Sequence, residues 1–269
     1  AEELNYTQSG ISRAVEALEK TVGFPILSRG RGGVRLTREG EELLPSMREM
    51  AYWAEQFEQT VQKLRGVQTG KLAVGSSYVK FFPWLTKIIS GFHEKYPGIT
   101  VELCSGTSTE LASRMNGKAL DFGIISRRDG AFSSTVIMRD ELVAMLPPEH
   151  PLASSASVPA TIFETEPFIE IHTGLQTDNT LCFLDRGITP NLSFSTPDSF
   201  IACGMVKAGL GVALVNRVIA DELSDAVAYV PLDPPEVIEI CAVTPPDDVI
   251  SPAAKAFKAY FFEMFSEMR

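Results

Sequence analysis

Small hydroxyl residues recur where a predicted strand passes into a predicted helix. They are Ser76 and Ser77 after KLAVG, Thr107 and Ser108 after ITVELCSG, and Thr196 ahead of Asp198 and Ser199. Serine, threonine and aspartate are good helix N-caps, so capping alone explains many such positions. Helix N-termini also bind anions, and ligands of open α/β sheets lie outside the carboxyl ends of the strands. The pattern therefore indicates either ordinary caps or a site for a small molecule that carries a carboxylate.

Charged and titratable side chains lie near the same junctions. Arg127 and Arg128 follow the predicted strand LDFGIIS, and either could pair with an acid. His172 lies at the end of the predicted strand PFIEI, whereas the other two histidines are expected to be structural. Asp198 leaves two outcomes open, because in a cleft it would repel an acid or attract an amine, while as a helix cap it would be silent.

A second kind of chemistry lies at the N-terminal end of the chain. TQSGISRAVEALEKTVG predicts a helix that stops at Gly23 and presents Gln8, Ser12 and Arg13 on its polar face. This face is either solvated or suited to base edges and phosphates, since a recognition helix carries short polar and arginine side chains near its N-terminus.

The loop that follows favours the nucleic-acid interpretation. RGRGGVR lies between the short extended pieces FPILSR and VRLT, and it carries Arg29, Arg31 and Arg35. Cations on a hairpin have the form of a wing that contacts phosphates or a minor groove. The chain's formal net charge is −10, so we expect a local DNA contact rather than coating of nucleic acid by bulk charge.

Composition narrows the class of protein. The 269 residues include 45% hydrophobic and 22% charged residues, as in soluble globular proteins, and no apolar run is long enough to span a membrane. No metal-ligand spacing, dinucleotide fingerprint or catalytic motif is present, so we expect no cofactor, no metal and no enzyme activity. The four scattered cysteines fit a reduced cytoplasmic setting, with Cys182 and Cys203 either buried thiols or a redox pair.

A long helix must connect the basic region to the rest. The stretch from Thr37 to Gly66 has apolar residues in alternating steps of four and three, and these residues are Leu43, Met47, Met50, Ala54, Phe57, Val61 and Leu64. This seam is typical of a coiled coil, so the stretch is either a dimerisation helix or a helix packed on its own core. The narrow stripe favours the dimerisation helix.

The remaining residues alternate strand and helix signals, as α/β folds do. The order repeats: Ile99 aligns with Ile188 and, at the same offset, Lys118 with Lys207. We therefore predict two similar α/β lobes that face each other across a cleft, a common place for a small-molecule site.

The run AEELNYTQSGISRAVEALEKTVGFPILSRGRGGVRLTREGEELLP resembles the winged helix-turn-helix of LysR-type transcriptional regulators. YPGITVELCSGTSTELASRMNGKALDFGII, EHPLA, GITP and VKAGLGVALV resemble that family's effector-binding domain. The resemblance implies a winged helix-turn-helix at residues 1–38, a linker and dimerisation helix at 39–68, and a two-lobed effector domain like that of periplasmic binding proteins at 69–269. The expected lobes are 69–140 with 245–269, and 141–244.

The resemblance also implies residue roles. DNA contacts are expected from Thr7, Gln8, Ser9, Ser12 and Arg13 on the recognition helix and from Arg29, Arg31 and Arg35 on the wing. Effector contacts are expected from Ser76, Ser77, Thr107, Ser108, Ile171, His172 and Thr173, with Arg127 and Thr196 added from the strand-end pattern.

In the family a further helix precedes the recognition helix, so we expect residues 1–4 to end that helix and the complete DNA-binding core to include residues before Ala1. The expected partners are operator DNA, a small-molecule effector and further copies of the chain, as a homodimer or homotetramer. The main alternative is a solute-binding sensor module that does not bind DNA, and an enzyme is a weaker one.

Overall fold

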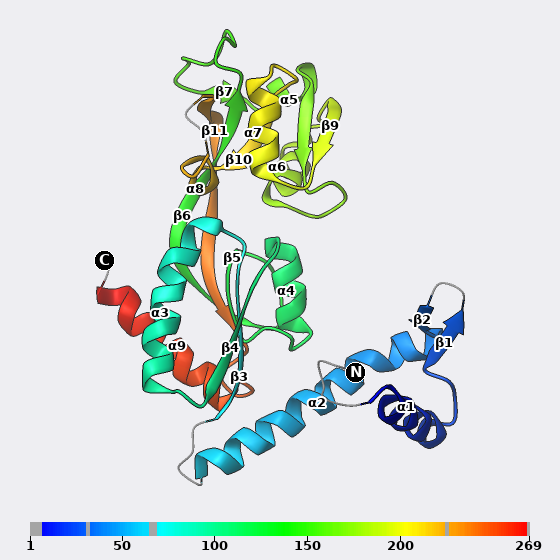
Figure 1. The fold of residues 1–269 in the computed structure, drawn as a ribbon. Coiled ribbons are helices and arrows are strands. Elements are labelled where there is room, and N and C mark those ends of the chain that lie inside the picture. Colours follow the sequence, from blue (N-terminus) through cyan, green and yellow to red (C-terminus); the bar gives the residue numbers. More distant parts are fainter. Residues whose placement is uncertain (1–6, 31–32, 65–68, 224–225, 268–269) are drawn as a thin grey trace. The chain divides into compact units, whose positions relative to one another are not determined.

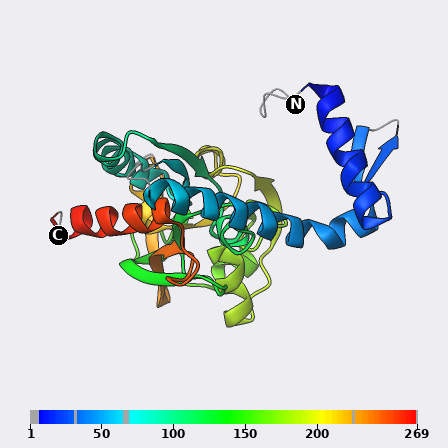
Figure 2. The same cartoon turned by 90° about the horizontal axis from the view of Figure 1, so that it is seen from below.

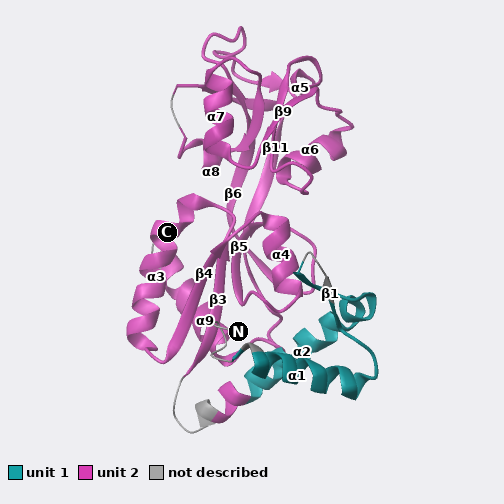
Figure 3. Ribbon diagram, turned by 45° about the vertical axis from the view of Figure 1, so that its right-hand side comes forward, with its two compact units in different colours: residues 1–57 teal, residues 58–269 magenta. Residues whose placement is uncertain are grey.

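The computed structural model describes residues 7–30, 33–64, 69–223 and 226–267. The chain forms two compact units, residues 1–57 and 58–269 (Figure 3). The predicted helix end at residues 1–4 and the wing residue Arg31 lie outside the described residues.

The first unit contains the predicted helix and wing. Helix α1 (Gln8–Val22) begins at Thr7, whose hydroxyl accepts from the Gly10 N–H. It ends at Gly23, where φ of 86° puts the backbone in the left-handed region that favours glycine. Strands β1 (Leu27–Gly30) and β2 (Gly33–Leu36) pair antiparallel, which confirms the hairpin (Figure 1).

Close backbone contacts fix the wing to the helices of the same unit. The Glu19 carboxylate of α1 accepts from the N–H groups of Ile26 and Leu27, at 2.7 and 3.0 Å. The Ile26 carbonyl accepts from the Thr37 N–H at 2.9 Å. A β-carbon at Gly40 would lie 2.3 Å from that carbonyl, so glycine is required there.

The long helix is also confirmed. Helix α2 (Arg38–Leu64) is capped by the Thr37 hydroxyl, which accepts from the Gly40 N–H at 3.0 Å. Along the predicted seam, Met50 is 74% exposed and Phe57 is 70% exposed. Within the part of the chain that the structure describes, these two side chains stay exposed, so this part of the seam is available to a partner helix.

The second unit begins with a three-layer lobe, here called lobe I (Figures 1 and 2). Strands β3 (Gly70–Ser76), β4 (Ile99–Ser105) and β5 (Phe122–Ser126) are parallel, in the order β5-β3-β4. The short helix η2 (Val79–Phe81) leads into α3 (Phe82–Lys95), and α3 packs with α9 (Pro252–Glu267) against an aromatic-rich core. Helix α4 (Ser108–Asn116) packs against a separate cluster that contains Leu120 and Ile125.

Lobe II has a similar plan with smaller parts. Its elements are β7 (Val158–Pro159), α5 (Ile162–Thr165), β8 (Phe168–Ile171), α6 (Asp178–Arg186), β9 (Leu192–Thr196), α7 (Ser199–Lys207), β10 (Ala213–Asn216) and α8 (Arg217–Ala220). The pair β9–α7 repeats the strand–helix order of β4–α4, as the sequence alignment within the chain predicts. Two buried clusters form the core of this lobe.

Two long antiparallel strands, β6 (Ser133–Leu146) and β11 (Ala228–Thr244), run through both lobes. Strand β11 pairs with β5 in lobe I, and β6 pairs with β10 in lobe II. Their mutual register shifts between Pro231 and Glu236, where β11 also pairs with β7 of lobe II. The predicted lobe boundaries at 140 and 244 fall within these two shared strands, and the limits of the lobes stay a prediction.

Candidate functional site

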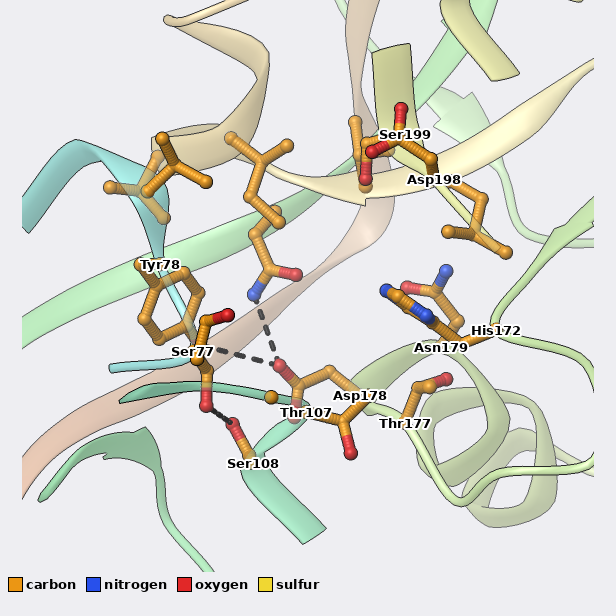
Figure 4. A pocket seen from close by; sticks show the side chains of 18 of the residues that line it. Ser77, Tyr78, Thr107, Ser108, His172, Thr177, Asp178, Asn179, Asp198 and Ser199 are labelled. Atoms are coloured by element: carbon orange, nitrogen blue, oxygen red, sulfur yellow. Dashed lines mark hydrogen bonds between the residues drawn. The ribbon is translucent and has the colours of Figure 1, made fainter. Parts of the chain in front are cut away.

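A cavity of about 320 Å³ lies between the lobes, at the ends of their strands (Figure 4). This volume suits a small metabolite. Lobe I contributes the junction after β3 and the N-terminus of α4, while lobe II contributes the end of β8 and the N-termini of α6 and α7. The cavity therefore lies where the strand-end rule for α/β sheets places ligands.

The predicted effector residues divide into two groups. Those that line the cavity are Ser77, Thr107, Ser108, Ile171 and His172, together with Arg128, Asp198 and Ser199 from the wider set of candidates. The structure does not bring Ser76, Arg127, Thr173 and Thr196 to the cavity wall.

Three of the predicted residues that do not line the cavity have local structural contacts instead. The Ser76 hydroxyl donates to the Tyr78 carbonyl and accepts from the Tyr78 N–H, so it shapes the turn after β3. The buried Thr196 hydroxyl accepts from the Asp198 N–H and so shapes the turn after β9. Arg127 pairs with Glu239 of β11 at 2.6 Å, while its neighbour Arg128 lines the cavity.

A chain of hydroxyls runs along the lobe I wall. The Ser77 and Ser108 oxygens are 3.1 Å apart, and the Ser108 and Ser126 oxygens are 2.8 Å apart. Ser108 also accepts from the Ser126 N–H at 3.0 Å. Since Ser108 is the first residue of α4, the helix N-terminus and the hydroxyl chain face the same space.

Asp178, at the first position of α6, reaches across the cleft from lobe II. One carboxylate oxygen accepts from Arg128 Nη2 at 2.8 Å and from the Ser126 hydroxyl at 2.6 Å. The other oxygen accepts from Asn216 Nδ2 at 3.1 Å and lies 3.5 Å from the Tyr78 hydroxyl (Figure 4). The side chains of Arg128 and Asp178 are only 9% and 10% exposed, so this ion pair is desolvated.

The buried tyrosine of this cluster is held neutral. Burial raises the pKa of Tyr78, and the negative charge of Asp178 raises it further. Tyr78 is 2% exposed and lines the cavity, so it offers a neutral hydroxyl to the space next to Asp178.

The cations of the cavity wall already have acidic partners. Lys80 pairs with Asp221 at 2.7 Å, and Arg128 pairs with Asp178. Asp198 accepts from the N–H groups of Phe200 and Ile201, so it caps α7 and also lines the cavity. Asp198 therefore occupies both positions that the sequence suggested, the helix cap and the cleft wall.

Glu110 of α4 and His172 at the end of β8 both line the cavity. Glu110 accepts from the Thr107 N–H and hydroxyl, and these bonds, with a smaller effect of His172, lower the pKa of Glu110. His172 has a φ of 61°, which is rare for a residue with a side chain. Its N–H donates to the Thr196 carbonyl and its carbonyl accepts from the Leu175 N–H, and these bonds hold the conformation.

Sequence reasoning missed the residues that join the lobes, namely Tyr78, Asp178 and Asn216. Thr177 and Asp178 follow a strand and open a helix, as the other candidate junctions do, and this pattern could have found them. Tyr78 is adjacent to the candidate Ser77, but an aromatic residue gives no signal of its own there.

The candidate DNA interface lies in the first unit. Thr7, Ser9 and Arg13 are exposed on α1, and Ser12 is half-buried. Arg35 is exposed on β2 of the wing. For Gln8 and Arg29 the structure gives the backbone, in α1 and β1, and not the side chain.

Over the described residues, no helix is long and apolar enough to cross a membrane. Cys182 and Cys203 are buried in separate clusters with free thiols.

Comparison with known proteins agrees with this architecture. Residues 65–266 match the LysR substrate binding domain, and residues 1–41 match the bacterial regulatory helix-turn-helix protein of the lysR family. The uncharacterised HTH-type transcriptional regulator YvbU of Bacillus subtilis is 26% identical over 265 residues, which cover 97% of this chain and 91% of that protein.

Solved structures share the fold. A full-length OxyR variant from Pseudomonas aeruginosa superposes with a TM-score of 0.70 at 18% identity and covers 97% of this chain and 86% of that one. The BenM effector binding domain with its effector benzoate has a TM-score of 0.59 at 19% identity, covering 75% and 94%. The QuiR effector binding domain in complex with shikimate has a TM-score of 0.60 at 19% identity, covering 74% and 98%.

The family models together span both compact units, and the substrate-binding match alone covers most of the chain. The chain belongs to the LysR family of bacterial transcriptional regulators, with a helix-turn-helix followed by an effector-binding domain, and it is not an enzyme.

Proposed function

We propose that this regulator binds operator DNA sequence-specifically and responds to a carboxylate-bearing effector in the cavity between lobes I and II. The single observation that carries the effector part is the cavity itself, where the N-terminus of α4 and a chain of hydroxyls face a space closed by lobe II. A regulator that acts on bacterial DNA works in the cytoplasm, and we place it there.

The DNA-binding part rests on α1 and the wing. Recognition-helix contacts come from Thr7, Gln8, Ser9, Ser12 and Arg13, and wing contacts come from Arg29, Arg31 and Arg35. The side chains of Arg13 and Arg35 are exposed, and arginine suits both phosphates and guanine edges.

A gel-shift experiment with the full-length protein and its own promoter region tests this assignment. We expect sequence-selective binding that weakens steeply as salt is raised, because phosphate contacts release counterions. No binding to any operator-like DNA would favour the rival, a sensor module that only captures its ligand.

Self-association is proposed to run through α2. Met50, Ala54 and Phe57 of the seam are exposed, and a second copy of the helix would cover them. A dimer presents two recognition helices to half-sites about one DNA turn apart, and pairing of dimers gives the tetramer. Phe57→Glu is expected to weaken the dimer in analytical ultracentrifugation, and an unchanged mass would exclude this seam.

The assignment of a carboxylate effector rests on hydrogen-bond donors of the cavity wall and not on an unpaired cation. Thr107 and Ser108 lie at the α4 N-terminus, whose N–H groups and dipole favour an anion, and Ser77 lies 3.1 Å from Ser108. His172 faces them from lobe II. Benzoate and shikimate, which occupy two effector domains of the same fold, are both carboxylates.

Calorimetric titration separates this class from others. We expect carboxylates from a panel of small acids to bind, and the matching amides, alcohols and amines to bind much more weakly. Binding of neutral or cationic compounds alone would contradict the carboxylate assignment and leave the DNA-binding assignment unaffected.

A further inference from the structure

The Asp178 carboxylate has the surroundings of a bound ligand. It comes from lobe II, yet two of its closest donors, Arg128 and Ser126, belong to the lobe I side of the cleft. Asn216 and Tyr78 complete the cluster around its second oxygen. A carboxylate with this many neighbours, including a buried arginine, makes the kind of contacts that a dedicated site makes to a free acid.

Its position also blocks the best anion site of the cavity. Arg128 is the buried cation of the cavity wall, and its Nη1 atom also donates to the Ser126 hydroxyl at 3.1 Å. Ser126 in turn touches Ser108, the first residue of α4. An effector carboxylate drawn to the α4 N-terminus therefore meets a donor cluster that Asp178 already occupies.

We propose that Asp178 is an internal carboxylate ligand of this cluster, which an acidic effector must displace in order to bind. This inference rests on the carboxylate effector of the proposed function. Without effector, Asp178 holds α6 of lobe II to the end of β5 in lobe I. When an effector carboxylate takes over Arg128 and Ser126, the interlobe ion pair breaks and α6 is released.

Displacement of Asp178 by the effector carboxylate determines which acids bind, and the same step changes the contact between the lobes. A tethered carboxylate competes at an effective concentration in the millimolar range or above, so weakly held acids are rejected. An effector succeeds only if the rest of the cavity, including His172 and Asn179, adds contacts that the Asp178 side chain cannot make. Binding then changes the contact between the lobes, as a population shift requires.

Chemical rescue with acetate tests the proposal without knowledge of the natural effector. Asp178→Ala removes the carboxylate and leaves Arg128 buried without its partner, so the melting temperature should fall by about 5–15 °C. Acetate at tens of millimolar should restore much of this loss, while acetamide and chloride at the same concentration should not. Asp185→Ala is the matched control, because Asp185 is an exposed carboxylate on the same helix and outside the cavity.

Asp178→Asn serves as a second variant if the alanine protein does not fold. It keeps the size of the side chain, removes the charge, and should bind the acid found in the calorimetric panel roughly tenfold more tightly than the unaltered protein. Hydrogen exchange of the Thr177–Thr180 amides in the unaltered protein should rise when that acid binds, because α6 is released.

The outcomes separate the two proposals. Acetate that stabilises the unaltered protein, Asp178→Ala and Asp185→Ala equally would overturn the internal-ligand role. Equal or weaker acid binding by Asp178→Asn would overturn it as well, with the carboxylate effector still standing. Selective acetate rescue together with a panel in which no acid binds would retain Asp178 as an occupant of an anion site and reject the carboxylate effector.

Discussion

The two compact units use charge in opposite ways. In the first unit, Arg13 and Arg35 are exposed, and their side chains extend from a helix and a strand without being needed by the fold. In the second unit, Arg128 is buried and its charge is matched by Asp178 across the interlobe cleft. An exposed charge is free to serve a partner, whereas a buried charge is part of the structure until something replaces its own partner.

Replacing one arginine from each unit tests most directly whether the buried and the exposed arginine contribute differently to stability. Arg128→Met leaves Asp178 buried without its cation and should cost about 3–5 kcal/mol of unfolding free energy. Arg13→Met should change that free energy by less than about 0.5 kcal/mol, since the side chain is exposed. Denaturant titration of both variants measures the difference, and equal losses would contradict the contrast.

Two serines extend the comparison to neutral groups. Ser108→Ala removes a hydroxyl that accepts from the Ser126 N–H in a buried setting and should cost about 1–3 kcal/mol. Acid binding should weaken at the same time, because the α4 end of the cavity loses a donor. Ser9→Ala, on exposed α1, should leave unfolding almost unchanged. Thermal melts and calorimetry on the two variants check this, and a stable Ser108→Ala protein with full affinity would refute it.

Glu110 gives a smaller effect that depends on pH. Its pKa is lowered by the Thr107 N–H and hydroxyl, so its stabilising contribution is present above the ordinary value of 4.5 and is lost as pH falls through the lowered pKa. Glu110→Gln should therefore differ from the parent most at neutral pH and least near pH 3. Melting temperatures across this range test the sign, and a constant difference would show that the capping charge is not responsible.

The smallest effect on stability is expected on the wing. Arg35→Ala should leave the melting temperature unchanged, because the side chain is exposed. It should reduce DNA affinity for all sequences alike and lower the slope of log affinity against log salt by about 1 if Arg35 contacts a phosphate. Gel-shift titrations at several salt concentrations measure this slope. Loss of sequence selectivity in place of salt dependence would assign Arg35 to base readout.

Local patterns predicted much of the fold. Gly23 ends α1, and the junction residues Thr107 and Ser108 line the cavity, because each of these depends on a few neighbouring residues. Caps and strand ends are local properties of a chain, and so sequence reasoning finds them.

The contacts within the interlobe cluster could not be predicted from such local patterns. Asp178 meets Tyr78 across 100 positions of sequence and Asn216 across 38, and nothing local to any of them indicates the others. The choice between Arg127 and Arg128 also depended on tertiary structure. Arg127 pairs with Glu239 of β11, whereas Arg128 pairs with Asp178 and lines the cavity.

The close approach of Gly40 to the Ile26 carbonyl has a mechanical consequence. The same carbonyl accepts from the Thr37 N–H, so the base of the wing packs tightly against the first turn of α2. A rotation of the start of α2 about its axis would therefore also displace the hairpin. The tip of the hairpin would move further than its base. A side chain at position 40 would separate the wing from α2 and so displace the wing arginines, although none of the DNA-facing residues had been replaced.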